Sequence, residues 1–178
     1  VMDYEDLKKK IDEIKIIDSV KFKTGVRYDS IRFDFTDDMD NSNSKINDIS
    51  EFIPWSELIY MYKDESSVYA NYAELFRSPS LGQMFTYGSF SNSNLQAEKA
   101  DSYELGVRHK FNEFLKTNCA LYYIKLNNEI WYDYDASKYE NYGKTSHKGI
   151  ETNFDFKIIK NITGFLNYTY TRAKNKSS

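Results

Sequence analysis

Hydrophobic and polar residues alternate strictly over much of the chain, and the segment from Tyr103 to Phe111 shows the pattern most clearly. One side of this segment carries apolar and aromatic residues, and the other side carries charged residues and a glycine. A period of two residues predicts a β-strand with two chemically different faces. The two sets are Tyr103, Leu105, Val107, His109 and Phe111 on the apolar side, and Glu104, Gly106, Arg108 and Lys110 on the charged side.

The same alternation recurs along the chain and predicts about eight strands. In the second of them the apolar phase slips by one position at Ile31, Phe33 and Phe35, which predicts either a β-bulge or the departure of the strand from a packed zone. The predicted strands are Ile11–Ile17, Val20–Asp29, Glu51–Lys63, Ser67–Phe76, Tyr103–Phe111, Leu115–Trp131, Ser146–Ile159 and Ile162–Ala173.

The predicted connections alternate between short and long. Tight turns are expected near Asp18, Asp64, Asn112 and Lys160, and long polar loops at Thr36–Ser50, Ser78–Asp101 and Tyr132–Thr145. In an antiparallel sheet of hairpins, all the short turns then lie at one end of the strands and all the long loops at the other. This asymmetry is typical of outer-membrane barrels. A small closed barrel, whose first and last strands pair, or a soluble lipocalin-like barrel with an apolar interior would alternate too.

Composition narrows the function classes. The 178 residues are 40% hydrophobic and 17% aromatic, with a formal net charge of -3, so there is no basic footprint for nucleic acid. A mean hydropathy of -0.69 does not argue against a transmembrane barrel, in which only alternate residues of short segments face lipid. His109 and His147 are the two histidines, and they have no metal-ligand spacing to the single cysteine, Cys119. We therefore expect neither an enzyme nor a metal site, and we interpret the acidic run Asp37–Asp40 as a solvated loop.

Five stretches in order resemble TonB-dependent outer-membrane receptors. The most specific are YANYAELFRSPSL from Tyr69 to Leu81, similar to an aromatic strand that ends in Phe-Arg-x-Pro, and NLQAEKADSYELG from Asn94 to Gly106, similar to Asn-Leu-x-Pro-Glu followed by Tyr-Glu-Leu-Gly. Ala97 departs from the family pattern, which usually has proline there. The other three stretches are GVRYD at 25–29, NYGKT at 141–145 followed by Gly149-Ile150-Glu151, and LNYTYTRA at 166–173.

The resemblance implies an all-β fold, a partial antiparallel transmembrane β-barrel with about eight strands of a larger 22-stranded one. Residues 1–178 would be part of the barrel domain, and the plug domain would lie outside them. By resemblance, the whole protein would sit in the outer membrane of a Gram-negative bacterium, contact its lipid, and receive energy from the TonB complex through the plug. It would import a scarce solute, most often a ferric siderophore, with cobalamin, haem or a glycan as alternatives. No cofactor is implied.

Candidate site residues follow from the strand pattern and the loops. Aromatic rings with polar handles suit flat, amphipathic ligands, and several lie in the predicted loop after Leu115–Trp131. The alternative for these aromatics is an interfacial girdle or loop packing. Gly106 and Gly149, on the charged side, would allow close approach of a plug or relieve crowding in a tilted strand. The candidate ligand-binding residues are Arg77, Trp131, Tyr132, Tyr134, Tyr139 and Tyr142, and the candidate lumen-facing wall residues are Arg27, Glu104, Arg108 and Glu151.

Overall fold

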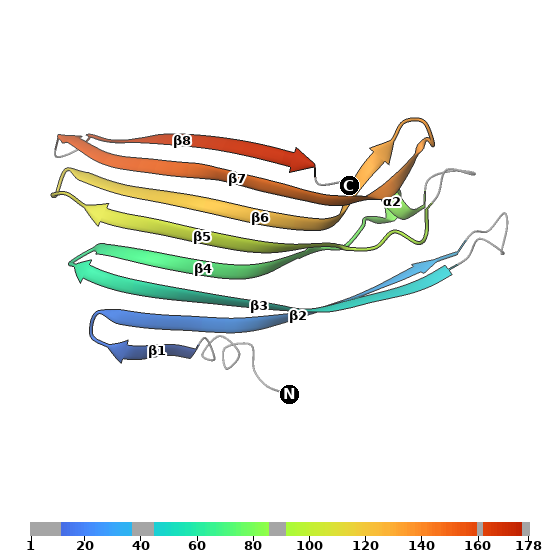
Figure 1. Ribbon diagram of the computed structural model, residues 1–178, viewed down its shortest axis with the longest axis horizontal. Coiled ribbons are helices and arrows are strands. Elements are labelled where there is room, and N and C mark those ends of the chain that lie inside the picture. The colour runs from blue at the N-terminus through green and yellow to red at the C-terminus, as the bar shows by residue number, and fades with distance from the viewer. Residues whose placement is uncertain (1–11, 37–44, 86–91, 160–161, 176–178) are drawn as a thin grey trace.

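The computed structural model describes residues 12–36, 45–85, 92–159 and 162–175, which form a single sheet of long strands and one short helix (Figure 1). The acidic run Asp37–Asp40 and the predicted turn at Lys160 lie outside the described residues. The elements are β1 (Asp12–Ile17), β2 (Val20–Phe35), β3 (Lys45–Lys63), β4 (Ser66–Arg77), α2 (Leu81–Met84), β5 (Glu98–Lys110), β6 (Leu115–Asp133), β7 (Lys138–Ile159) and β8 (Ile162–Asn175).

The eight strands follow one another across the sheet in chain order, and each is antiparallel to its neighbours. β1 and β8 therefore form opposite edges of an open sheet (Figure 1). A small closed barrel would need these two strands to pair, so that alternative is wrong for the described residues. The prediction of about eight strands in antiparallel hairpins is confirmed.

The phase slip in β2 is not a bulge. β2 pairs with β3 without any register shift, from Val20 opposite Tyr60 to Phe35 opposite Lys45. β3 stops pairing with β4 beyond Trp55, and the β2–β3 hairpin continues away from the rest of the sheet (Figure 1). The slip therefore marks the part of β2 that has left the region where one face is apolar.

All three of the predicted long loops are partly strand, and β5 begins at Glu98, inside the predicted loop Ser78–Asp101. β3 begins at Lys45, inside the predicted loop Thr36–Ser50. The predicted loop Tyr132–Thr145 is wrong for most of its length, because β6 runs to Asp133 and β7 begins at Lys138. The segment Thr36–Ser50 is rich in Asp, Asn and Ser, and the segment Tyr132–Thr145 is rich in Tyr and Asp; both lack the alternation that identified the other strands.

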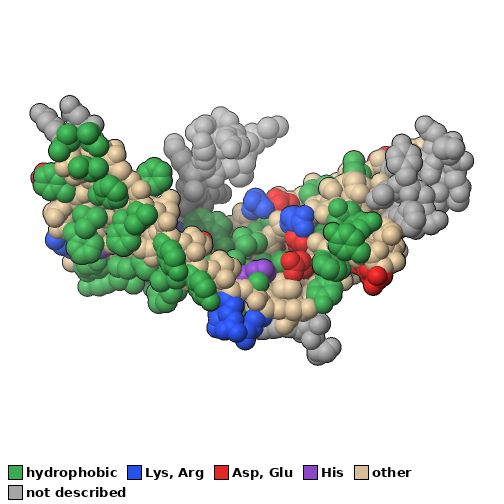
Figure 2. Space-filling view, turned by 90° about the horizontal axis from the view of Figure 1, so that it is seen from above, with side chains coloured by type: hydrophobic (Ala, Val, Ile, Leu, Met, Phe, Trp, Pro, Cys, Tyr) green, Lys and Arg blue, Asp and Glu red, His purple; other side chains and the backbone are tan. Residues whose placement is uncertain are grey.

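The sheet has an apolar face and a polar face, as the alternation predicts. The apolar face carries Tyr103, Leu105 and their neighbours on other strands; the polar face carries Glu104, Gly106 and Arg108. Leu105 is 55% exposed and Leu121, directly opposite it, is 56% exposed. Apolar side chains gather over the end where the short turns lie (Figure 2). Large apolar residues on an uncovered face contradict a soluble barrel with an apolar interior and suit a lipid-facing surface. None of the described helices is long and apolar enough to span a membrane.

Glycines on the polar face lie opposite aromatic residues. A Cβ on Gly106 would lie 2.2 Å from Cζ of Tyr69, the residue directly opposite it on β4. A Cβ on Gly149 would lie 2.1 Å from the carbonyl oxygen of Tyr170 on β8 and 2.6 Å from the hydroxyl oxygen of Tyr122, its partner on β6. These glycines relieve crowding by making room for a ring from the next strand, one of the two alternatives that the sequence left open. Gly25 opposite Trp55 repeats the arrangement on the polar face, and Gly164 opposite Phe156 does so on the apolar face.

Candidate functional site

The candidate site lies at the long-loop end of the sheet, where Arg77 and Glu98 join β4 to β5. Arg77 and Glu98 are directly opposite each other, and the guanidinium donates from Nε and Nη2 to the two carboxylate oxygens at 2.5 Å each. Glu98 also accepts from the backbone N–H of Ile130 on β6 at 2.6 Å. Burial favours the neutral acid, but the bonds from Arg77 and Ile130 outweigh it and hold the pKa of Glu98 below its usual value. The bidentate pair joins β4 to β5, and the bond from Ile130 joins them to β6.

The chain between α2 and β5 is held onto the β6–β7 hairpin by amide side chains. Asn141 accepts from the Gln96 backbone N–H at 2.8 Å and donates to the Gln96 carbonyl at 2.9 Å. The same Asn141 amide also donates to the carbonyl of Asn128, a residue with a φ of 57°. Asn92 donates to the Tyr139 carbonyl at 3.0 Å. Backbone groups that would otherwise lack partners are satisfied in this way, so this loop has a defined place over the polar face of the sheet.

A small apolar cluster lies under the same loop. Met84 from α2, Leu95 from the loop and Ile130 from β6 are buried together, and Tyr139 packs against them. Ser80 begins α2 with a capping box, in which its hydroxyl accepts from the Gln83 N–H and the Gln83 side chain accepts from the Ser80 N–H. Because Tyr139 is part of this cluster, its ring stabilises the loop.

The structure separates the predicted aromatic site into two sides of one hairpin. Tyr132 lies opposite Tyr139 on the side of the loop, with ring centroids 5.1 Å apart. Trp131 and Tyr142 share the other side, with centroids 5.8 Å apart. Tyr134, in the turn between β6 and β7, contacts both Tyr132 and Trp131. The predicted residues are therefore neighbours in space, but they do not form one surface.

A polar cleft of about 650 Å³ opens beside the loop. Its lining combines amides and hydroxyls, such as Asn94, Gln96 and Ser50, with charged and apolar side chains, and it includes the ion pair between Lys99 and Glu51. Such a lining suits a polar solute with many hydrogen-bonding groups. No group of three or more His, Cys, Asp or Glu side chains placed to hold a metal ion occurs among the described residues.

The four predicted wall residues all lie on the polar face. Arg108 contacts Glu57 at 3.5 Å and lies 4.1 Å above the Tyr69 ring. Glu104 is hydrogen-bonded to the Tyr69 hydroxyl. Arg27 pairs with Asp29 of its own strand at 2.9 Å, and Glu151 is exposed on β7. These charges neutralise one another or meet solvent along this face.

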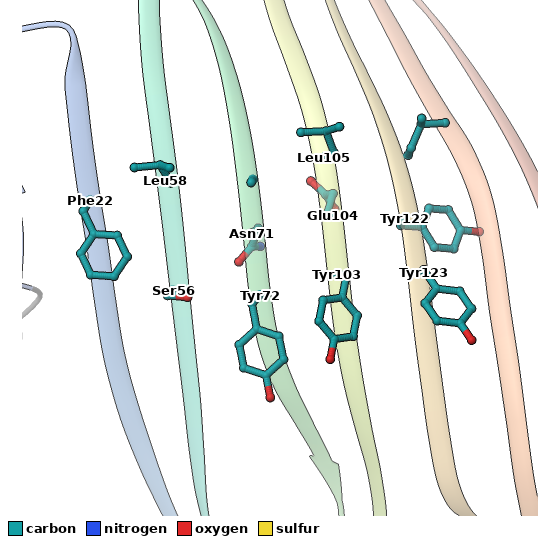
Figure 3. Close-up of a pocket in the computed structure, with 12 residues that line it drawn as sticks. Phe22, Ser56, Leu58, Asn71, Tyr72, Tyr103, Glu104, Leu105, Tyr122 and Tyr123 are labelled. Carbon is teal, nitrogen blue, oxygen red and sulfur yellow. The ribbon is translucent and has the colours of Figure 1, made fainter.

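A second hollow, of about 520 Å³, lies on the apolar face and away from the candidate site (Figure 3). Ala70 lies directly between Leu58 on β3 and Leu105 on β5. Its small side chain leaves a hollow that is lined on either side by larger apolar residues. The hydroxyls of Tyr72 and Tyr103 point toward the long-loop end (Figure 3). Tyrosines with rings beside apolar rows and hydroxyls turned away from them are typical of a membrane interface.

Sequence reasoning missed Glu98, Asn141 and Gln96 as site residues. Glu98 and Gln96 lie in the stretch from Asn94 to Gly106 that carries the family resemblance. That stretch indicated the family but not the roles of these two residues. Asn141 begins the stretch 141–145 that also carries the resemblance, but neither stretch alone predicts its bonds to Gln96, which lies 45 residues away in the chain.

Comparison with known families gives one match over nearly the whole chain. Residues 11–178 match the family described as TonB dependent receptor-like, beta-barrel. Among curated proteins, the vitamin B12 transporter BtuB of Vibrio cholerae is 36% identical over 98 residues, which are 54% of this chain and 16% of BtuB.

Solved structures show the same fold. The ferric-catecholate import receptor Fiu from E. coli superposes with a TM-score of 0.69 at 19% identity, over 92% of this chain and 27% of Fiu. The alcaligin outer membrane receptor FauA from Bordetella pertussis gives a TM-score of 0.67 at 20% identity, over 92% of this chain and 29% of FauA. The chain therefore spans less than a third of each of these three relatives.

Proposed function

This chain belongs to the TonB-dependent receptor β-barrel family, a family of outer-membrane transporters of Gram-negative bacteria, and we propose that it forms eight strands of the wall of a receptor that imports ferric siderophores. The observation that carries the proposal is the open antiparallel sheet with a lipid-type apolar face, a charged polar face and its long connections at one end. In the complete receptor the polar face lines the lumen, where Arg27, Glu104, Arg108 and Glu151 meet water or the plug.

The solute contacts the long-loop end on the side of the polar face. Tyr132 lies on that side, and the cleft beside the loop adds amide, hydroxyl and charged groups at the same end of the sheet. Trp131 and Tyr142 face the other way, so they serve the outer surface of the barrel. Arg77 donates to both carboxylate oxygens of Glu98 and acts by positioning the loop.

The siderophore assignment draws on relatives. Fiu and FauA are named for ferric-catecholate and alcaligin, respectively. BtuB is named for vitamin B12 and shares 36% identity, which makes cobalamin the second candidate. Energy would reach the barrel from the TonB complex through the plug domain of the complete receptor.

Uptake by cells that carry the intact receptor tests the proposal. Cells lacking their own receptors for these solutes are supplied with radiolabelled ferric catecholate, ferric hydroxamate or cobalamin, with and without a functional TonB protein. We expect TonB-dependent accumulation of one of the ferric siderophores. TonB-dependent uptake of cobalamin alone would replace the siderophore assignment with the second candidate, and uptake unchanged by loss of TonB would contradict both.

A further inference from the structure

The strands β3 and β4 separate at Pro54, although both continue beyond that point. The ladder between them ends with Trp55 opposite Ala73. β3 stays paired with β2 as far as Lys45, and β4 stays paired with β5 as far as Arg77 (Figure 1). Each strand at this split therefore has its other neighbour among the described residues, and the split lies inside the sheet rather than at one of its outer edges.

The direction of the backbone groups explains why the ladder ends there. In an antiparallel sheet, successive residues of a strand direct their N–H and C=O groups to opposite edges. The Met61 N–H donates to the Ser19 carbonyl at 2.7 Å, so Met61 faces β2. The Trp55 carbonyl accepts from the Thr24 hydroxyl on β2 at 2.9 Å, so Trp55 faces β2 as well. Pro54 then faces β4, where it has no N–H to donate across the next pair.

The same alternation identifies the backbone groups that face the split. Phe52, Ser50 and Asp48 are separated from Pro54 by even numbers of residues, so their N–H and C=O groups also point away from β2. By the same rule, Glu74 and Phe76 of β4 face the split from the other side. None of the backbone hydrogen bonds within the described part of the chain fills these positions. The split is therefore bordered by strand edges that lack a partner strand.

A slot runs along this edge of β3. The polar cleft of about 650 Å³ and a smaller pocket of about 190 Å³ are both lined by Glu51, Phe76 and Lys99, so the two form one slot. Along β3 the slot extends from Ile53 to Asn47, which is about 20 Å of extended strand. An extended polypeptide segment of about seven residues has the same length.

Packing beyond the split fixes the position of the β3 edge. Phe33 of β2 packs against the apolar cluster of Met84, Leu95 and Ile130 under the loop. The β2–β3 hairpin is thereby attached to the loop, although β3 is not paired with β4 at this height. The slot is thus preformed, and an occupant gains its main-chain hydrogen bonds without first having to order the edge.

The end of the slot at Pro54 is acidic. Glu74 and Asp101 are directly opposite each other, and both carboxylates accept from the Tyr72 hydroxyl, at 3.2 and 3.1 Å. Like charges that face each other across two strands destabilise a sheet. Lys125, opposite Asp101 on β6, lies over two tyrosine rings, and neither carboxylate is in an ion pair within the described residues. A cationic side chain of an occupant would relieve this repulsion.

We propose that the slot between β3 and β4 binds an extended segment of a partner protein, which pairs with the unpaired edge of β3 and places a lysine or arginine beside Glu74 and Asp101. An extended backbone satisfies a row of unpaired backbone groups, which is how peptides add to exposed sheet edges. The partner reaches the receptor from outside the cell, because the slot lies at the long-loop end. This inference does not depend on which solute the receptor imports.

Peptide binding to the intact receptor in detergent micelles tests the proposal. Main-chain pairing depends little on sequence, so the probe is a fluorescent peptide, Thr-Lys-Thr-Val-Thr-Lys-Thr, with both ends capped. Its two lysines allow either direction of binding to place one of them beside Glu74. The comparison peptides are two that are N-methylated at alternate residues, one for each edge of the peptide, one with glutamate in place of both lysines, and one with uncapped ends.

The receptor variants separate main-chain pairing from side-chain contact. Ser50→Pro removes an N–H that faces the slot, at a position where an edge strand tolerates proline. Ser50→Ala is the matched control, because it removes the hydroxyl and keeps the N–H. Glu74→Gln removes one of the two carboxylates without changing the size of the side chain.

We expect Ser50→Pro, and N-methylation of one edge of the peptide but not of the other, to raise the Kd about three- to tenfold each, the contribution of a main-chain hydrogen bond. Ser50→Ala should change the Kd less than about twofold. At low salt, Glu74→Gln and the glutamate peptide should each weaken binding about two- to fivefold.

An unchanged Kd in Ser50→Pro would overturn the proposal, as would equal binding of both N-methylated peptides and the parent peptide. Tighter binding of the uncapped peptide than of the capped one would show a site for free oligopeptides instead and would also overturn it. Absence of saturable binding by the capped probe up to about 1 mM would show that the edge of β3 takes no strand.

Discussion

The ring of Tyr69 on β4 lies in the space where Gly106 on β5 lacks a side chain. The two residues are directly opposite each other, and a Cβ on Gly106 would meet ring Cζ at 2.2 Å and the hydroxyl oxygen at 2.4 Å. Tyr69 is only 4% exposed, and the Arg108 guanidinium covers its ring from 4.1 Å. The ring therefore has little freedom to move, and the small size of Gly106 is a packing requirement of the polar face.

We expect Gly106→Ala in the intact receptor to lower the free energy of unfolding by about 1–3 kcal/mol, the usual cost of overpacking. Gly143→Ala is the matched control, because nothing lies within 4 Å of its added methyl; a change below about 0.5 kcal/mol is expected there. Urea unfolding in micelles measures both. Tyr69→Leu should recover part of the loss in the double variant, and equal stabilities of Gly106→Ala and Gly143→Ala would refute the packing role.

The Arg77–Glu98 pair gives a prediction about the loop that follows β4. Glu98 is 8% exposed, so Arg77→Met leaves a buried carboxylate without its bidentate partner. Because the Arg77 side chain is 53% exposed and partly screened by water, we expect a loss of about 1–3 kcal/mol rather than the full cost of a buried pair. Hydrogen exchange of the backbone at 92–97 should accelerate accordingly.

Arg27→Met is the control for that experiment. The Arg27–Asp29 pair has a similar distance, 2.9 Å, but the Arg27 side chain is 63% exposed. Exposed pairs contribute between zero and about 1 kcal/mol, so exchange at 92–97 should stay at the wild-type rate. Acceleration by Arg27→Met as large as by Arg77→Met would show that any lost arginine on the polar face loosens the loop.

Glu65 predicts a pH dependence confined to the short-turn end. Hydrogen bonds from Lys110, then from Lys116, lower the pKa of Glu65 to about 2 from its usual 4.5. A lowered folded-state pKa means that the stabilisation is complete above pH 4.5 and is lost as the pH falls toward 2. Side-chain NMR of a labelled Glu65 should show the shifted titration.

Exchange of the turn amides at 64–65 supplies the second readout. It should accelerate between pH 4.5 and 2 in the wild type, after correction for intrinsic rates. Glu65→Gln should exchange at the faster rate already at pH 6 and lose this dependence. Glu113→Gln, which also removes a carboxylate at this end of the sheet, should keep it. A Glu65 that titrates near 4.5 would contradict the bridge.

How far the sequence predicted this structure depends on what each strand faces. β5 and residues 20–29 of β2 were identified because lipid on one side of a strand enforces a period of two residues. The long-loop ends of β3 and β7 were predicted as loops because water on both sides removes that period. The packing of Tyr69 over Gly106 depends on the register between β4 and β5, and a one-residue slip would abolish it. No pattern within either strand contains that information.

The two sides of the β6–β7 hairpin supply the last prediction, which tests the site itself. Tyr132 lies on the side of the loop, whereas Trp131 lies on the outer side. If the solute enters over the polar face, Tyr132→Ala should weaken solute binding about two- to tenfold, the contribution of one aromatic contact. Trp131→Ala removes a larger ring from the same hairpin and should leave solute affinity unchanged.

Tyr139→Ala separates loop packing from solute contact, because Tyr139 packs against Met84, Leu95 and Ile130. It should speed hydrogen exchange at 92–97, which Tyr132→Ala should not. Solute affinity measured by fluorescence quenching in the intact receptor decides the assignment: loss with Trp131→Ala and not with Tyr132→Ala would place solute contact on the outer side of the hairpin.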